Sequence, residues 1–278
     1  MSSSVFDLTG KRALVAGGTG DLGCVMVKGL CDAGVKVVVL GSSEGVDALV
    51  ASLDAPGEPR VTGVRANLAD RADVVRGFER ALQMLDGKLD ILVNAQGIQR
   101  RYPAEEFPLE IWDQVLEVNL TSVFELCQLA GRVMLEQGRG KIINIASMNS
   151  YTGGITIPAY AASKAGVALL TKALCNEWSS KGINVNAIAP GYMDTKMTAA
   201  IKADPVRNPQ ILARIPIGRW GTPEDLVGPL LFLASPASDY LAGIVLPVDG
   251  GWRGRVAKKI GDYLHISRTL KNQRLGVE

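Results

Sequence analysis

The sequence has little of what marks several protein classes. Its 278 residues include only four cysteines, which have neither the paired spacing of metal ligands nor the density of a disulfide framework. Lysine and arginine number 30 against 28 acidic residues, and the net charge of +2 gives no reason to expect a nucleic-acid or membrane partner. No uninterrupted apolar run could span a bilayer, and residues 1–4 lack the basic and apolar regions of a signal peptide. We therefore expect a cytoplasmic protein without a bound metal.

Apolar residues, 47% of the chain, are arranged in short runs that alternate with longer helical patterns. The runs are rich in β-branched residues and lie at residues 12–16, 35–40, 60–64, 90–94, 141–145, 183–188 and 244–248. Several are apolar throughout, which is typical of strands buried on both faces. Helical patterns occupy residues 21–32, 71–85, 109–136, 160–180 and 223–234. This alternation predicts an α/β fold of the doubly wound, Rossmann type, with about seven parallel strands and helices on both faces.

No repeat or low-complexity linker divides residues 1–252, so one domain is expected there. The composition changes after Trp252, because residues 253–278 hold seven lysines and arginines against two acidic residues. We interpret this stretch as a solvated basic extension. Binding of an anion or of a partner subunit is the alternative.

A glycine-rich turn follows the first predicted strand. It reads Gly17-Gly18-Thr19-Gly20-Asp21-Leu22-Gly23 and opens the first predicted helix. Glycines permit a tight turn and close backbone approach, while the free N–H groups and the positive dipole of a helix N-terminus attract a pyrophosphate. The turn therefore predicts a dinucleotide site.

The end of the second strand is where the ribose of such a dinucleotide is recognised. An acidic residue there bonds the 2′-hydroxyl of NAD, and an arginine pairs with the 2′-phosphate of NADP. Here Gly41, Ser42 and Ser43 are followed by Glu44. Without a base, and with Glu44 nearby, the sequence favours NAD and leaves NADP open.

Three residues with acid–base chemistry are expected at the carboxyl edge of the sheet, where ligands bind in open α/β folds. Ser147 follows the fifth strand, and Tyr160 and Lys164 lie four apart on one face of the next helix. An ammonium beside a phenol lowers its pKa, so Tyr160 could exchange a proton with an alcohol. Asn119 is a polar exception in an apolar helix, and a water relay to Lys164 would satisfy its amide.

Together with Pro190-Gly191, these motifs resemble the short-chain dehydrogenase/reductase family over about residues 5–252. The resemblance implies that Tyr160 is the acid/base, Ser147 orients the substrate, Lys164 bonds the nicotinamide ribose and Asn119 holds a relay water. It also implies a homotetramer. The implied cofactor contacts are Gly17, Thr19, Asp21, Leu22, Gly41, Ser42, Asn67, Leu68, Asn94, Gly97, Tyr160, Lys164, Pro190, Met193 and Thr195.

The sequence departs from the family pattern in the cofactor region. Ala16 stands where a threonine usually opens the glycine motif, and Asp21 stands at the position of its middle glycine. A carboxylate near a pyrophosphate is unfavourable, so we expect the Asp21 side chain to turn outward, for example to cap the helix. In place of Asn-Asn-Ala-Gly after the fourth strand, residues 94–97 read Asn-Ala-Gln-Gly.

Longer runs resemble one subgroup of this family, the 2-deoxy-D-gluconate 3-dehydrogenase or 2-dehydro-3-deoxy-D-gluconate 5-dehydrogenase group. They include KIINIASM at residues 141–148, INVNAIAPGYM at residues 183–193 and IPIGRWG at residues 215–221. The resemblance implies a sugar-acid substrate. Independently of it, Arg100 and Arg101 follow the fourth strand, where a guanidinium could bind a carboxylate. Ser147, Met148, Asn149 and Tyr192 are expected to border the same pocket.

Two other functions stay open at this stage. One is an NADP-dependent gluconate, polyol or ketose reductase. The other is a dinucleotide-binding protein without catalysis, because a fold does not imply a function.

Overall fold

The computed structural model describes residues 4–42, 44–53 and 60–254. Within them, seven strands form one parallel sheet in the order β3-β2-β1-β4-β5-β6-β7, as predicted. The strands are β1 (Arg12–Ala16), β2 (Lys36–Gly41), β3 (Val61–Arg65), β4 (Ile91–Asn94), β5 (Gly140–Ile145), β6 (Ile183–Pro190) and β7 (Val245–Val248). Most of the predicted basic extension, from residue 255 on, lies outside the described residues.

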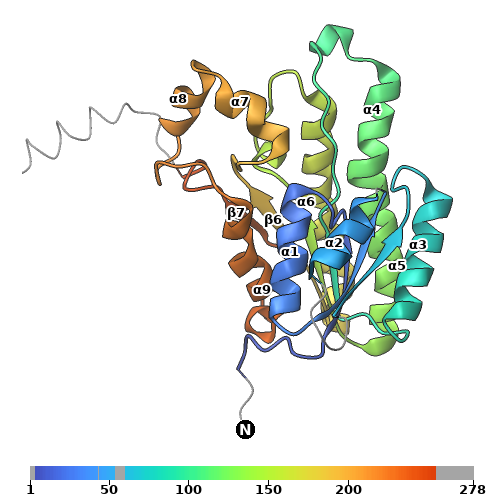
Figure 1. The fold of residues 1–278 in the computed structure, drawn as a ribbon. Coiled ribbons are helices and arrows are strands. Elements are labelled where there is room, and N and C mark those ends of the chain that lie inside the picture. The colour runs from blue at the N-terminus through green and yellow to red at the C-terminus, as the bar shows by residue number, and fades with distance from the viewer. Residues whose placement is uncertain (1–3, 43, 54–59, 255–278) are drawn as a thin grey trace, which may run out of the picture.

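Helices cover both faces of the sheet (Figure 1). One face carries α1 (Asp21–Asp32), α2 (Gly45–Leu53) and α9 (Val227–Ala234). The other carries α3 (Arg71–Met84), α5 (Ser122–Gln137) and α6 (Pro158–Trp178). Alternation along each strand feeds both layers, since Leu14 of β1 packs toward α3 and α5, whereas Val15 packs toward α1 and α9. Both residues are at most 1% exposed, as continuous apolarity in the strands predicted.

The helices differ from the prediction in three places. The pattern at residues 109–136 is not one α-helix but α4 (Leu109–Leu116), a π-helical turn (Glu117–Thr121) and α5. The pattern at residues 223–234 begins as a 3-10 turn, which Thr222 and Asp225 cap before α9 starts. The sequence analysis missed α2, α7 (Ala199–Ala203) and α8 (Arg207–Leu212), because they are short and bury few residues.

The short helices α7 and α8 lie beyond the carboxyl end of β6 and rise above the sheet (Figure 1). A small third core holds them there. It joins Ile201 and Ile211 to Trp220 and Trp252, all at most 8% exposed. None of the helices in the described part of the chain has the length and apolarity needed to cross a bilayer.

Candidate active site

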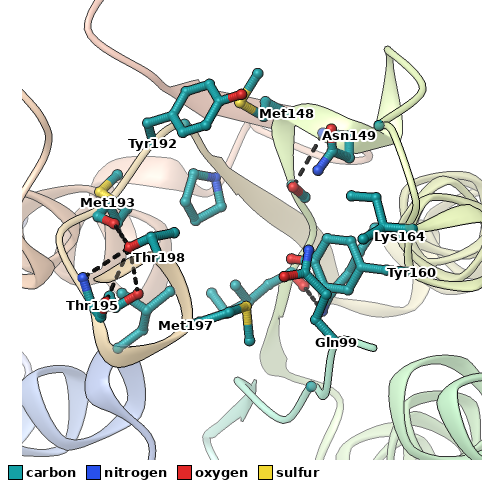
Figure 2. Close-up of a pocket in the computed structure, with 18 of the residues that line it drawn as sticks. Gln99, Met148, Asn149, Tyr160, Lys164, Tyr192, Met193, Thr195, Met197 and Thr198 are labelled. Carbon is teal, nitrogen blue, oxygen red and sulfur yellow. Dashed lines mark hydrogen bonds between the residues drawn. The ribbon is translucent and has the colours of Figure 1, made fainter. Parts of the chain in front are cut away.

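A cavity of about 410 Å³ opens at the carboxyl edge of the sheet. Its walls come from the glycine turn before α1, the ends of β4, β5 and β6, the start of α6 and the α7–α8 segment (residues 195–214). Figure 2 shows Gln99, Tyr160 and Lys164 on one side of it, facing Met193, Thr195 and Thr198 on the other. Segments far apart in the sequence thus converge where ligands bind in this class of sheet.

Ser147 is fixed by a local turn. It caps the 3-10 turn that follows β5, because its Oγ accepts the N–H of Asn149 at 3.1 Å. The backbone N–H of Ser147 donates to Ser150 Oγ, which in turn donates to the carbonyl of Lys164 at 2.6 Å. The turn is thereby tied to α6, and Ser147 lines the cavity with 6% of its surface exposed.

Lys164 ties α6 back to β5. Its ammonium donates to the carbonyl of Ile145 at 2.7 Å and lies 3.5 Å from the carbonyl of Gln96. The residue is 3% exposed, and burial lowers the pKa of its ammonium to about 8. The i,i+4 spacing places Lys164 and Tyr160 on the same side of the cavity, as predicted (Figure 2).

The expected effect of Lys164 on Tyr160 is wrong for this structure. Burial raises the pKa of the Tyr160 phenol, and only a hydrogen bond with Ser147 opposes that rise. Desolvation dominates because the Lys164 ammonium is directed to backbone carbonyls rather than to the phenol. The environment of Tyr160 in this structure therefore favours the protonated hydroxyl.

Asn119 lies in the π-helical turn and is fully buried. Its Oδ1 accepts the N–H of Ile98 at 2.8 Å, and its Nδ2 donates to the carbonyl of Ile98 at 2.9 Å and to Ser163 Oγ at 3.2 Å. The predicted water relay is thus not needed to satisfy this amide, because the β4–α4 loop (residues 95–108) and α6 supply its partners. A π-helical turn often marks a functional site.

Known proteins are similar to this chain over most of its length. Residues 19–253 match the family model described as Enoyl-(Acyl carrier protein) reductase. The 2-dehydro-3-deoxy-D-gluconate 5-dehydrogenase of Dickeya dadantii is 46% identical over 256 residues, which are 92% of this chain and 100% of that protein. The enzyme of the same name from Bacillus subtilis is 47% identical over 90% of this chain and 97% of its own. A solved structure of a gluconate 5-dehydrogenase from Burkholderia cenocepacia, in complex with NADP and tartrate, is 37% identical, covers 90% of this chain and 98% of its own, and has a TM-score of 0.85.

The chain belongs to the short-chain dehydrogenase/reductase family. It is an NAD(P)-dependent oxidoreductase, as the resemblance implied.

The glycine turn fits the dinucleotide of this family. Gly17 has a φ of 73°, and a Cβ there would lie 2.5 Å from the backbone of Gln96, so only glycine permits the turn. At Gly23 a Cβ would lie 2.2 Å from the carbonyl oxygen of Gly17. Gly20 begins α1 without a side-chain cap, and residues 20–23 line the cavity. The backbone N–H groups of this helix end can therefore hold a pyrophosphate.

Asp21 lines the cavity and does not cap α1, contrary to the expectation that it turns outward. Its Oδ2 accepts the backbone N–H of Lys196 at 2.6 Å, and the Lys196 ammonium lies 4.0 Å from Oδ1. The residue that departs from the family's glycine therefore joins the cofactor turn to the start of the α7–α8 segment.

Of the remaining predicted residues, Leu22, Gly97, Arg101, Asn149, Pro190, Tyr192, Met193 and Thr195 line the cavity. Arg100 does not; its guanidinium is exposed and donates to the carbonyl of Gln99 at 3.0 Å. Thr19, Gly41, Ser42 and Asn67 lie outside the cavity, around the end of β2 and β3, and Leu68 packs in the core.

The departure at residues 94–97 has a structural reason. The Asn94 side chain is buried and donates to Asn144 Oδ1 at 2.9 Å, so it belongs to the interior of the sheet rather than to the cavity. Gln96 is also buried and donates to Ser122 Oγ at 3.1 Å, which connects β4 to the start of α5.

The sequence analysis missed several residues that line the cavity. They are Gln96, Gln99, Met197, Thr198, Ile201, Arg207, Arg214 and Trp252, besides Thr152, Gly153, Gly154, Ile155 and Ile157. Arg207 begins α8, whereas Arg214 lies two residues beyond the end of this helix at Leu212. Neither position could be predicted, because a six-residue helix with one buried residue makes no periodic pattern.

Proposed function

We propose that this enzyme transfers a hydride between a nicotinamide dinucleotide and a secondary hydroxyl or ketone of a sugar acid of the deoxygluconate or keto-deoxygluconate type. The observation that carries the proposal is Arg101. Its guanidinium lines the same cavity as Ser147 and Tyr160 and forms no ion pair within the described residues. A guanidinium that lines the cavity without a carboxylate partner in the described residues favours an acidic substrate. The names of the relatives from Dickeya dadantii and Bacillus subtilis support the same class.

In this proposal Tyr160 takes the proton of the substrate hydroxyl during oxidation and returns it during reduction. Ser147, which lines the same cavity, holds the same oxygen. The nicotinamide, when bound, supplies the hydride acceptor or donor. Lys164 connects α6 to the carbonyl of Ile145 at the end of β5 and so helps to position Tyr160. Asn119 positions the β4–α4 loop through Ile98 and α6 through Ser163.

Both dinucleotides are candidate carriers. Residues 41–44 contain no base, which favours NAD. However, Arg65 at the end of β3 is the register partner of Gly41, and it is paired with Asp47 of α2. This guanidinium lies near the strand end where a 2′-phosphate is recognised. The relative from Burkholderia cenocepacia has NADP bound.

A substrate panel measured with NAD(H) and NADP(H) in parallel tests the proposal. We expect kcat/KM for acids of the keto-deoxygluconate type to exceed that for neutral polyols and ketoses of the same length. Preference for neutral sugars would instead favour a polyol or ketose reductase. Tight dinucleotide binding without any hydride transfer would favour a non-catalytic binding protein.

We also propose a homotetramer in the cytoplasm. Apolar side chains lie exposed on the helices of one face, where Leu109 of α4 is 75% exposed, Phe124 of α5 43% and Leu169 of α6 68%. Such side chains on neighbouring helices are typical of a subunit interface. Sedimentation of the protein and of a Phe124→Glu/Leu169→Glu variant tests the assembly, because a tetramer should dissociate in the variant. Cell fractionation tests the location.

A further inference from the structure

The charges that line the cavity are unequal. Besides Lys164, three guanidinium groups line it, those of Arg101, Arg207 and Arg214. Asp21 is the only acidic residue of the lining within the described part of the chain, and its carboxylate already accepts the N–H of Lys196. Within residues 4–254, apart from the gaps at 43 and 54–59, no free carboxylate of the lining therefore neutralises the arginines.

Arg101 is held by weak and neutral partners. Its Nη1 lies 3.5 Å from the carbonyl of Ile155 and 3.4 Å from Thr156 Oγ1, and its Nη2 lies 3.4 Å from Gln99 Oε1. These distances are at the long end for hydrogen bonds. Burial lowers the pKa of Arg101, and the positive charge of Arg207 lowers it further. The two guanidinium groups thus repel one another across the same cavity.

The acid nearest to Arg207 in the sequence, Asp204, binds backbone N–H groups rather than the guanidinium. The Asp204 carboxylate accepts the backbone N–H groups of Val206 and Arg207 at 2.8 and 2.9 Å, at the start of α8. Within the described residues no carboxylate lies within ion-pair distance of the Arg207 guanidinium.

Arg214 differs from these two, because its guanidinium stacks on an aromatic ring. The Arg214 Cζ lies 4.0 Å from the centroid of the Trp252 ring, which also packs against Tyr192 with centroids 4.8 Å apart. This stacking stabilises the third core and makes Arg214 part of the cavity wall.

We propose that the substrate carboxylate binds between Arg101 of the β4–α4 loop and Arg207 of α8, and thereby joins the α7–α8 segment to the catalytic side of the cavity. This inference rests on the proposed function, since it requires an acidic substrate. A carboxylate between two guanidinium groups replaces their repulsion with two charge-assisted interactions. A neutral sugar of the same shape gains neither. Arg207 is then a specificity residue contributed by a segment that the sequence analysis missed.

Steady-state kinetics of Arg207→Gln test this inference. With a sugar acid that the native enzyme turns over, we expect KM to rise roughly 10- to 100-fold, the loss of a hydrogen-bonded charge, while kcat changes little. With a neutral polyol or ketose we expect no change in KM. Arg207→Lys should recover part of the affinity for the acid, because lysine keeps the positive charge but lacks the paired N–H donors of a guanidinium.

Arg100→Gln is the matched control, because Arg100 precedes Arg101 in the same loop but does not line the cavity. Its KM for the acid should equal that of the native enzyme. In the double variant Arg101→Gln/Arg207→Gln, the effects should not add, since both residues bind one carboxylate. Equal KM values for Arg207→Gln and the native enzyme, or a large rise only in Arg214→Gln, would overturn the inference.

A binding measurement gives a readout without turnover. With the protein saturated by reduced dinucleotide, gluconate cannot be oxidised, and its affinity can be measured by calorimetry against that of the neutral polyol glucitol. We expect gluconate to bind more tightly, and Arg207→Gln to remove the difference. If the native enzyme turns over no sugar acid, the proposed function fails. If it does, and Arg207→Gln binds gluconate as the native protein does, only the carboxylate site fails.

Discussion

The two sides of the cavity are built differently. On the catalytic side, α6 buries eight of its 21 residues, and Lys164 and Ser150 connect it to β5 and to the turn of Ser147 through hydrogen bonds of 2.6 to 2.7 Å. On the opposite side, α7 and α8 bury one residue each, and Met197 and Arg207 are exposed. The acid–base groups therefore rest on a rigid scaffold, whereas the proposed substrate contact rests on a segment with few buried groups.

This difference teaches where each kind of specificity is stored. Proton transfer needs a hydroxyl within hydrogen-bond reach of the reacting oxygen, and rigid elements maintain such geometry. Recognition of a particular acid needs charge at the right place and tolerates a segment that adjusts. Loops on a rigid scaffold commonly carry such recognition. Variants on the two sides should accordingly change different measured quantities.

The largest effect is expected on the catalytic side, from Tyr160→Phe. Removal of the hydroxyl removes the acid/base, so kcat should fall roughly 10²- to 10⁴-fold. The dissociation constant of the dinucleotide, measured by fluorescence titration, should stay within about twofold, since the remaining cavity is unchanged. Tyr102→Phe is the control, because Tyr102 does not line the cavity. A Tyr160→Phe enzyme with native kcat would exclude Tyr160 as the acid/base.

The buried ammonium on the same side should appear in the pH dependence of stability. Burial lowers the pKa of Lys164 from 10.5 to about 8, so between these pH values the unfolded chain binds a proton that the folded chain does not. The free energy of unfolding then rises with pH, and the cost of burying the charge is fully present only below pH 8. Relative to Lys164→Met, the native protein should gain about 2 kcal/mol between pH 7 and 9.5.

Urea unfolding at the two pH values measures this gain. Lys172→Met, an exposed lysine on α6, is the matched control and should track the native protein at both. A constant difference between the native protein and Lys164→Met would show that the folded chain keeps this ammonium charged throughout the range.

The less buried side, that of α7 and α8, is connected to the glycine turn through Asp21, and this connection can be broken. Asp21→Ala removes the acceptor of the Lys196 N–H, and a hydrogen bond to a charged group contributes about 1.5 kcal/mol or more. Hydrogen exchange of the Lys196 amide, followed without dinucleotide, should therefore accelerate on the order of tenfold. Asp21→Asn keeps an acceptor and should accelerate it less. Lys196→Met retains the backbone N–H and should leave the exchange rate unchanged. An unaltered exchange rate in Asp21→Ala would contradict the hydrogen bond between Asp21 and the Lys196 amide.

The smallest effect is expected in the loop that carries the partners of Arg101. Thr156 is a β-branched residue with a φ of 64°, in the left-handed region that glycine occupies freely. Thr156→Gly should raise the free energy of unfolding by about 1 kcal/mol, because relief of the backbone strain exceeds the loss of the Oγ1 hydrogen bonds. Thr152→Gly in the same loop has no such strain to relieve and should lower it. If both variants are destabilised equally, the backbone at Thr156 costs nothing.

The sequence by itself determined the sheet and the residues of the rigid side. Strands buried on both faces must be continuously apolar, which made β1 to β7 recognisable within one or two residues. The glycine turn, Ser147, Tyr160 and Lys164 were also predictable, because each follows a strand end or lies at a fixed helical spacing. These are local patterns, and they do not depend on which other segments lie nearby.

Only the tertiary structure decided what faces these residues. The α7–α8 segment shows little periodicity because one residue buried per helix makes no pattern, so the position of Arg207 could not be predicted. The partner of Asp21 is 175 residues away in the chain, and the partners of Asn119 belong to two other elements. The pKa values followed the same rule, since burial and not the neighbouring Lys164 dominates at Tyr160. The burial of a residue and the charges around it depend on all the surrounding segments. Those segments come together only when the chain folds.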